Sequence, residues 1–348
     1  MSVEFWCGGP TPDAVQAARR AENAGYDGII FVDSQNLTED CYVLLGLAVE
    51  ATNSIYLGIG VTNPVTRHPA TTASAIATVQ ARSGGRAHLG IGRGDSALAH
   101  LGYAPAPMRV LEDYLIKVQA YLRGDEVPFD ADANVDSLGL SGQPGGSRLA
   151  WLTADVPKVP VDVAATGPRA IRLAARYADR VSLMVGADRA RVSWGMDIAH
   201  QARKEAGLSG DIPFTTYIPL VVHDNPEVAW RMGEGPLASI ARFSVMHGHI
   251  VGPVSKAEKA TLDRVHDAYD MTRHAQGESA QSSLLSTEFA QEFGIYGPPD
   301  YCAERLQALV ELGVDRIIIA GGPALGAEDP EQARAAERLA SEVFPLLR

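Results

Sequence analysis

The segment "ATGPRA", residues 165–170, has the features of a phosphate-binding turn. Gly167 lets the backbone approach a ligand closely, and Pro168 suits the first position of a helix. A helix that begins here presents free N–H groups and the positive end of its dipole to an anion. The same Gly-Pro pair also begins helices that bind nothing. The motif alone therefore supports a phosphate site and a plain helix start about equally.

A second segment, "GIGRGDS", residues 90–96, offers a charged pair within a glycine-rich turn. Arg93 could pair with an anionic group, and Asp95 could accept a hydrogen bond from a ring N–H or a ribityl hydroxyl. Alternatively, Asp95 caps the helix that follows. The capping interpretation is preferred unless other residues support a site.

Several other kinds of catalytic site are not indicated by the sequence. It contains no CxxC or HxxxH metal pattern, no GxSxG hydrolase turn and no Walker A loop. We therefore predict no metal site. The three cysteines, Cys7, Cys41 and Cys302, are far apart, which indicates buried thiols in a reducing compartment rather than disulfides.

Short apolar runs precede both motifs and alternate with helical patterns along the chain. Eight strands are expected at about residues 3–7, 26–34, 55–63, 86–92, 159–166, 179–186, 212–223 and 314–322. A helical pattern follows each strand, beginning with residues 13–25 and ending with residues 330–344. The count of eight, with no GxGxxG after the first strand, favours a (β/α)8 TIM barrel over a doubly wound open sheet.

We expect a single domain, residues 1–348, with two insertions at about residues 124–158 and 226–295. The first is rich in Gly, Ser, Asp and Pro, and we predict a small hairpin around "SRLAWLT", residues 147–153. In a (β/α)8 barrel the active site lies at the carboxyl ends of the strands. Both motifs follow strands, so the fold brings them to the same end of the barrel.

The bulk composition limits the partners of this chain. It has 348 residues, of which 46% are hydrophobic, and a formal net charge of −12. No run of Lys and Arg is present, which argues against nucleic acid and anionic membranes. With no long apolar span and no signal-peptide pattern, we expect a cytoplasmic protein that acts on a small molecule.

Four motifs in order, "FVDSQNLTEDCYV", "LGIGVTNPVTRHPA", "LGIGRGDS" and "AATGP", resemble the bacterial luciferase-like flavin and deazaflavin oxidoreductases. The nearest branch is the methylenetetrahydromethanopterin reductases that use coenzyme F420. The resemblance implies a TIM barrel that holds a ring cofactor in its mouth. It also implies a bulge at the end of the third strand, with a non-prolyl cis peptide at Gly60–Val61, on which the ring rests.

The same resemblance assigns residues to the cofactor. The expected contacts are Gly60, Val61, Thr62, Arg93, Gly94, Asp95, Ala164, Ala165, Thr166, Gly167 and Pro168. Asp33 and Ser34 match the pair beside the ring, and with Asp95 they are the candidate catalytic residues. Arg67 and His68 either contact a ligand or hold their loop, and for Arg67 the structural role is preferred.

One residue departs from the pattern of the sugar-phosphate dehydrogenases in this family, in which a catalytic His follows the Asp. Here Ser34 stands at that position, so no imidazole is present to take a proton from a substrate hydroxyl.

The leading hypothesis is F420-dependent hydride transfer to a small organic substrate. The alternatives are an FMN-dependent monooxygenase that uses reduced flavin and oxygen, and a non-catalytic barrel subunit. The resemblance also implies a homodimer or homotetramer, and residues 245–290 are a candidate mobile lid.

Overall fold

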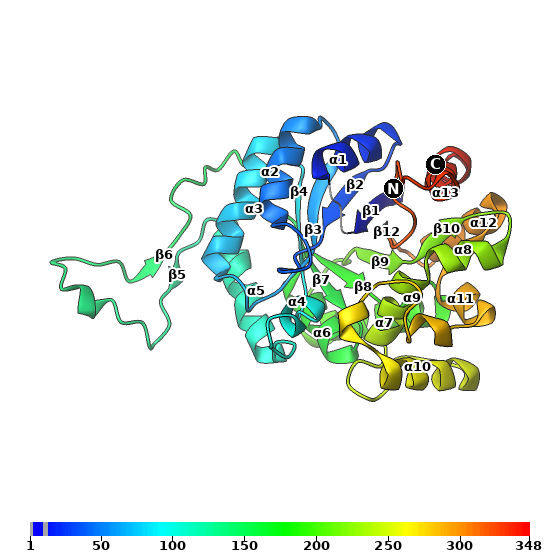
Figure 1. Cartoon of the computed structure of the whole chain (residues 1–348). Coiled ribbons are helices and arrows are strands. Elements are labelled where there is room, and N and C mark those ends of the chain that lie inside the picture. Colours follow the sequence, from blue (N-terminus) through cyan, green and yellow to red (C-terminus); the bar gives the residue numbers. More distant parts are fainter. Residues whose placement is uncertain (1–2, 10–12) are drawn as a thin grey trace.

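Eight parallel strands close into a barrel, so the predicted (β/α)8 architecture is confirmed (Figure 1). The computed structural model describes residues 3–9 and 13–348, so part of the turn expected after the first strand lies outside the described residues. Around the barrel the order is β1-β12-β9-β8-β7-β4-β3-β2. These strands are β1 (Glu4–Gly9), β2 (Gly28–Phe31), β3 (Tyr56–Thr62), β4 (Ala87–Ile91), β7 (Val161–Ala165), β8 (Arg180–Leu183), β9 (Phe214–Ile218) and β12 (Arg316–Ala320).

Helices follow the barrel strands and cover the outside of the barrel (Figure 1). They are α1 (Ala14–Asn23), α2 (Cys41–Ala51), α3 (Pro69–Ser83), α5 (Met108–Leu122), α6 (Pro168–Tyr177), α7 (Arg189–Glu205), α12 (Pro299–Val310) and α13 (Pro330–Arg338). Local sequence sets their ends: the Asp40 side chain accepts the Tyr42 and Val43 amides at the start of α2. Gly84 ends α3 in the left-handed conformation, which glycine adopts readily. In the part of the chain described, no helix is long and apolar enough to cross a membrane.

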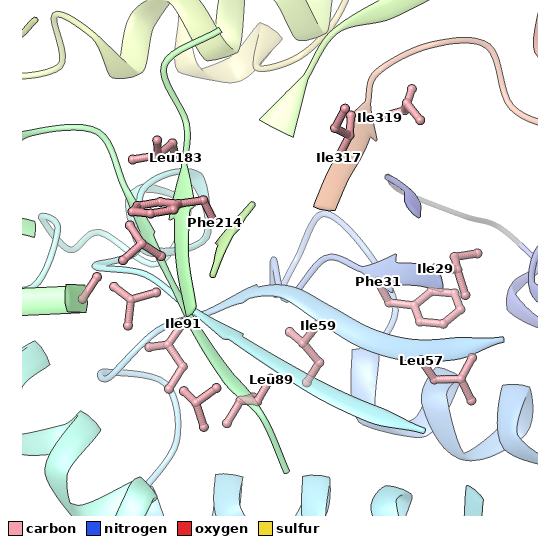
Figure 2. Packing of buried hydrophobic residues seen from close by; sticks show 14 of the residues in the cluster. Ile29, Phe31, Leu57, Ile59, Leu89, Ile91, Leu183, Phe214, Ile317 and Ile319 are labelled. Atoms are coloured by element: carbon pink, nitrogen blue, oxygen red, sulfur yellow. The ribbon is translucent and has the colours of Figure 1, made fainter. Parts of the chain in front are cut away.

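Alternate residues of each strand face the helices and form the main core. Leu57 and Ile59 of β3 and Leu89 and Ile91 of β4 are fully buried in this cluster (Figure 2). The intervening residues point into the barrel, where Trp6, Ile30, Tyr217 and Ile318 form a separate apolar cluster. Strand alternation therefore divides the core into an outer shell and a filled interior.

A network of charged side chains fills the barrel at the amino ends of the strands. Asp162 of β7 lies 3.0 Å from His88 Nε2 and 3.7 Å from Arg316 Nη1, and it accepts from Ser182 Oγ at 2.9 Å. Burial alone would raise the pKa of Asp162, but the interaction with His88 and the charges of Arg316 and Arg180 hold it well below its usual value. Burial lowers the pKa of His88, which favours the neutral ring.

The two insertions differ in detail from their predictions. The first forms a two-residue ladder, β5 (Val127–Pro128) with β6 (Gly146–Ser147), in a long arm that extends away from the barrel (Figure 1). The predicted hairpin at residues 147–153 is therefore wrong beyond Ser147, because residues 148–153 carry no strand. The arm also holds a short turn, η1 (Asp136–Leu138).

The predicted long seventh strand is also wrong, because it divides at Pro219 into β9 and β10 (Leu220–Val222). Proline has no N–H to continue a ladder. β10 leaves the barrel and pairs with β11 (Ile295–Gly297), which was not predicted. Between them lie α8 (Pro226–Met232), α9 (Glu234–Phe243), α10 (Lys256–Ala268) and α11 (Thr287–Phe293), as the mostly helical second insertion predicts.

The buried carboxylate at the base of the barrel gives a stability test. Asp162→Ala leaves Arg316 and Arg180 without their shared carboxylate, so we expect the free energy of unfolding to fall by about 3–5 kcal/mol. Denaturant unfolding of the purified protein measures this change. The control, Asp113→Ala, removes an exposed partner of Lys117 and should cost under about 1 kcal/mol. Equal costs for the two variants would contradict a structural role for the network.

Candidate active site

A bulge at the end of β3 is the central feature of the strand ends. The β3–β4 register shifts between Ile59 and Thr62, so Thr62 is opposite Ile91. The peptide bond between Gly60 and Val61 is cis, as the resemblance to the family implies, and this prediction is confirmed. The bulge thus lies at the carboxyl end of the barrel, where (β/α)8 enzymes carry their active sites.

Small residues surround the bulge because there is no room for larger ones. A Cβ on Gly60 would lie 2.2 Å from Ile30 Cδ1, and one on Gly90 would lie 2.4 Å from the Ile59 carbonyl oxygen. A Cβ on Gly92 would lie 3.0 Å from Val61 Cγ2 and 3.9 Å from the Cβ of Ala164. The bulge and the end of β7 are therefore close neighbours across β4.

Asp33 joins the ends of β2 and β3. Its carboxylate is buried and accepts a hydrogen bond from Thr62 Oγ1 at 2.6 Å. Gln35 Nε2 donates to its other oxygen. Burial raises the pKa of Asp33, and the Thr62 hydrogen bond and the nearby Arg67 charge oppose this shift. Ser34 is half-buried, and its carbonyl accepts the Leu37 and Thr38 amides, which fixes the turn after Asp33.

The loop after the bulge is held by its own side chains. The Arg67 guanidinium pairs with Asp40 and lies 4.5 Å from the centre of the Tyr42 ring. This agrees with the structural role preferred for Arg67, although its partners are side chains rather than backbone carbonyls. His68 Nδ1 accepts the Ala70 amide at 3.2 Å and caps α3.

The charged pair after β4 contacts the second insertion. Asp95 pairs with Arg242 of α9 and makes no capping hydrogen bond to α4 (Ser96–Ala99), so the capping interpretation is wrong. Arg93 Nε donates to the Ala106 carbonyl at 2.6 Å, and Arg93 Nη1 lies 3.0 Å from His247 Nε2. Between them Gly94 has a φ of 80°, which glycine adopts without strain.

The phosphate-type motif is built as the sequence predicts. Ala164 and Ala165 end β7, and Thr166 Oγ1 donates to the Met184 carbonyl at 3.3 Å. Gly167 precedes α6, which begins at Pro168 and has no side-chain cap. The first amides of α6 that follow Pro168 therefore lack a capping side chain.

Positive charges gather near the start of α6. Partial burial lowers the pKa of His247, and so do the charges of Arg93, His249, Arg169 and Arg242. Burial and the charge of Arg169 likewise lower the pKa of Arg93. Like charges brought together in this way favour a bound anion.

The second insertion also covers this part of the barrel. Val251 Cγ1 lies 3.8 Å from the point where a Cβ on Gly167 would be. Arg242 stacks 4.6 Å from the centre of the Tyr269 ring, whose hydroxyl lies 2.7 Å from His274 Nδ1. Arg242 and Tyr269 are site residues that the sequence alone does not indicate. The only available signal was the excess of histidine and charged residues in this insertion.

Comparisons with known proteins agree with this architecture. The family model described as luciferase-like monooxygenase matches residues 8–316. The 5,10-methylenetetrahydromethanopterin reductase of Methanolobus tindarius is 28% identical over 330 residues, which cover 93% of this chain and 94% of that protein. The F420-dependent glucose-6-phosphate dehydrogenase of Beutenbergia cavernae is 27% identical over 347 residues, covering 94% and 91%.

A solved structure has the same fold over its whole length. The coenzyme F420-dependent tetrahydromethanopterin reductase of Methanopyrus kandleri superposes with a TM-score of 0.77 at 22% identity, covering 100% of both chains.

The close contact at Gly60 gives a test of the bulge. Gly60→Ala places a methyl group against Ile30 Cδ1, and we expect a loss of about 1–3 kcal/mol in the free energy of unfolding. Ile30→Val removes that Cδ1 atom, so the double variant should lose less than the sum of the two single variants. Thermal and denaturant unfolding measure these values.

Gly46→Ala in α2 is the matched control, because nothing lies within 4 Å of its added Cβ. It should be neutral or should stabilise the protein by about 0.5–1 kcal/mol. Strict additivity of Gly60→Ala and Ile30→Val would show that the two side chains do not compete for this space.

Proposed function

Because the chain belongs to the luciferase-like monooxygenase family, we propose that it is an oxidoreductase that uses coenzyme F420 for hydride transfer with a small organic substrate. The family model covers residues 8–316, and a relative and a solved neighbour of matching length both carry F420 in their names. The observation that carries the proposal is the bulge at Gly60–Val61, which lies beside the uncapped start of α6.

The residues at the bulge fit a flat ring. Gly60, Val61 and Thr62 would support one face of it, because Gly92 and Ala164, which lie beside Val61, are small. Asp33 holds Thr62 through a buried hydrogen bond, so the support has a fixed position. A ring held on such a fixed surface pays little reorganisation cost on binding.

The start of α6 fits the phosphate that both F420 and FMN carry. Ala164, Ala165, Thr166, Gly167 and Pro168 would bring backbone groups to the phosphate, and the helix dipole favours its charge. Arg93 would supply a guanidinium to it, with Gly94 and Asp95 alongside the connecting chain. Partial burial is the first cause of the lowered pKa of His247, and the positive charges around it lower the pKa further.

Bound F420 supplies hydride chemistry, and the protein supplies position and a dry environment. Asp33 would orient the bulge, and Ser34 and Asp95 would line the substrate side as hydrogen-bonding groups. Ser34 cannot act as the proton acceptor that a His provides in the alcohol-oxidising relatives. This favours a reductase whose substrate is an electrophilic carbon.

The second insertion would act as the cover of this site. The contacts of Arg93 with His247 and of Asp95 with Arg242 tie it to the turn after β4. Movement of residues 245–290 would admit the ligands, and their return would exclude water.

Two alternatives fit parts of the same geometry. An FMN-dependent monooxygenase would use the same bulge and the same phosphate site, and the name of the family model favours it as the second candidate. A non-catalytic barrel subunit would need neither, so the intact bulge and α6 start count against it.

We also propose a single cytoplasmic domain that assembles as a homodimer or homotetramer. The thiols of Cys7, Cys41 and Cys302 are free, as a reducing compartment would keep them. α2 is apolar except for Glu50, and Val43 and Leu47 on its outer face are 62% and 52% exposed. A helix of this kind is usually buried, so a second copy of the chain would cover it.

Parallel calorimetric titrations with F420 and FMN test the proposed function. We expect F420 to bind with a micromolar or lower dissociation constant, and FMN to bind at least about tenfold more weakly, which is ~1.4 kcal/mol. If the protein bound FMN more tightly than F420, the result would support the FMN-dependent monooxygenase instead. Binding of neither cofactor would overturn the proposed function.

The phosphate assignment has its own control within α6. Arg169→Ala, at the start of the helix, should weaken F420 binding about three- to tenfold through lost charge. Arg176→Ala, two turns further along the same helix, removes an equal charge and should leave binding unchanged. Equal effects of the two variants would place the phosphate elsewhere.

The apolar face of α2 predicts the effect of charges on assembly. A Val43→Glu/Leu47→Glu double variant should be monomeric in sedimentation velocity at concentrations where the wild type is a dimer or tetramer, because buried carboxylates disfavour an apolar interface. Leu208→Glu, at a side chain 40% exposed after α7, is the matched control and should leave assembly unchanged. A monomeric wild type would contradict the proposed assembly.

A further inference from the structure

The hydroxyl of Tyr217 lies directly beside the bulge, inside the barrel. Tyr217 is on β9, opposite Ile318 in register, and it packs in the interior cluster with Trp6 and Ile30. Its hydroxyl oxygen is 3.0 Å from the point where a Cβ on Gly60 would lie. The side chain therefore spans the barrel from β9 to β3 and brings one polar atom to the bulge.

This hydroxyl makes no hydrogen bond to residues 3–9 and 13–348, and the side chain is only 4% exposed, but the oxygen itself is not fully buried, unlike that of Tyr296. A buried tyrosine normally pairs its O–H, because an unpaired buried donor costs free energy. The Tyr217 ring packs against Trp6, Ile30 and Ile318, and the charges of Asp162 and Arg316 also act on it. Its hydroxyl is therefore available to a water molecule or to a bound ligand.

Tyr217 can only act as a hydrogen-bond donor or acceptor, and not as a charged base. Burial raises its pKa well above the usual value for tyrosine, and the negative charge of Asp162 in the layer below raises it further. The raised pKa favours the protonated phenol at neutral pH, although the charge of Arg316 opposes part of the shift.

We propose that Tyr217 is a positioning residue that donates a hydrogen bond to the ring of the bound cofactor. The inference rests on the proposed function and adds a residue of this chain to it. The acceptor would be an oxygen or nitrogen of the pyrimidinedione part, which flavins and deazaflavins share. The atom at ring position 5 cannot be an acceptor that both cofactors share, because it is a nitrogen in a flavin and a carbon in a deazaflavin.

Tyr217→Phe tests this assignment in the full-length protein with two readouts of opposite sign. The cofactor-free variant should be about as stable as the wild type, because the removed hydroxyl makes no hydrogen bond to the described residues. Calorimetric titration should show that its dissociation constant for F420 rises about five- to tenfold, as loss of one hydrogen bond predicts. A purely structural tyrosine would give the reverse pattern, with lower stability and unchanged affinity.

Tyr296→Phe is the matched control. The Tyr296 hydroxyl likewise makes no hydrogen bond to the described residues, but it is fully buried and lies on β11 beside Gly233 rather than at the bulge. We expect Tyr296→Phe to leave cofactor affinity unchanged.

The outcomes separate this inference from the function on which it rests. Wild-type binding of F420 or FMN together with unchanged affinity in Tyr217→Phe would overturn the role of Tyr217 alone. An equal loss in Tyr296→Phe would also overturn it, since the effect would then not be local. If the wild type binds neither cofactor, the proposed function and this inference fail together.

Discussion

At Gly60 the inner face of β3 has no room for a side chain, and the candidate site depends on this constraint. A Cβ at this point would lie 2.2 Å from Ile30 Cδ1. On the neighbouring strand and just after it, a Cβ on Gly90 or Gly92 would also make close contacts. With these glycines present, β3 can shift its register by the end of the strand. The shift brings Thr62 to Asp33, and this buried hydrogen bond fixes the bulge from the β2 side.

Residues at the amino ends of the barrel strands contribute to stability, and residues at the carboxyl ends form the candidate site. At the amino ends, Asp162, His88 and Arg316 link β7, β4 and β12 through buried charges. At or just after the carboxyl ends of β3, β4 and β7, the small residues Gly60, Gly92 and Ala164 leave room beside the bulge. A stable base allows the opposite end to keep unpaired groups such as the Tyr217 hydroxyl, since local costs at functional sites are offset elsewhere in a fold.

Much of this arrangement could be predicted because its signals are local in the sequence. Strand alternation and the Gly-Pro start of α6 each lie within short segments, so the barrel and the helix start follow from them, whereas the bulge is predicted from the resemblance of the motif around Gly60 to the family. The boundary errors have local causes as well. Pro219 lies inside an apolar run whose pattern continues through it, and β5 and β6 are only two residues long, which leaves almost no periodicity to detect.

The contacts made by the second insertion could not be predicted in this way. Asp95 and Arg242 are 147 residues apart, and Arg93 and His247 are 154 apart, so no short-range pattern links them. A charged residue after a glycine turn equally suits a helix cap, and only the tertiary fold decides between the two. Tyr217 was missed for a related reason: an aromatic residue in a strand indicates core, and its unpaired hydroxyl becomes apparent only when its neighbours are known.

Arg93 can hydrogen-bond to the second insertion and to an anion at the same time. Its Nε is used by the Ala106 carbonyl and its Nη1 by His247, while Nη2 has no partner within the described residues. The lowered pKa of His247 keeps that ring neutral, so its Nε2 can accept the Nη1 hydrogen. An anion at the start of α6 could therefore take the Nη2 hydrogens without breaking the contact that ties down the insertion. Its charge would also offset the repulsion among Arg93, Arg169 and Arg242. On these grounds anion binding and closure of the insertion reinforce each other.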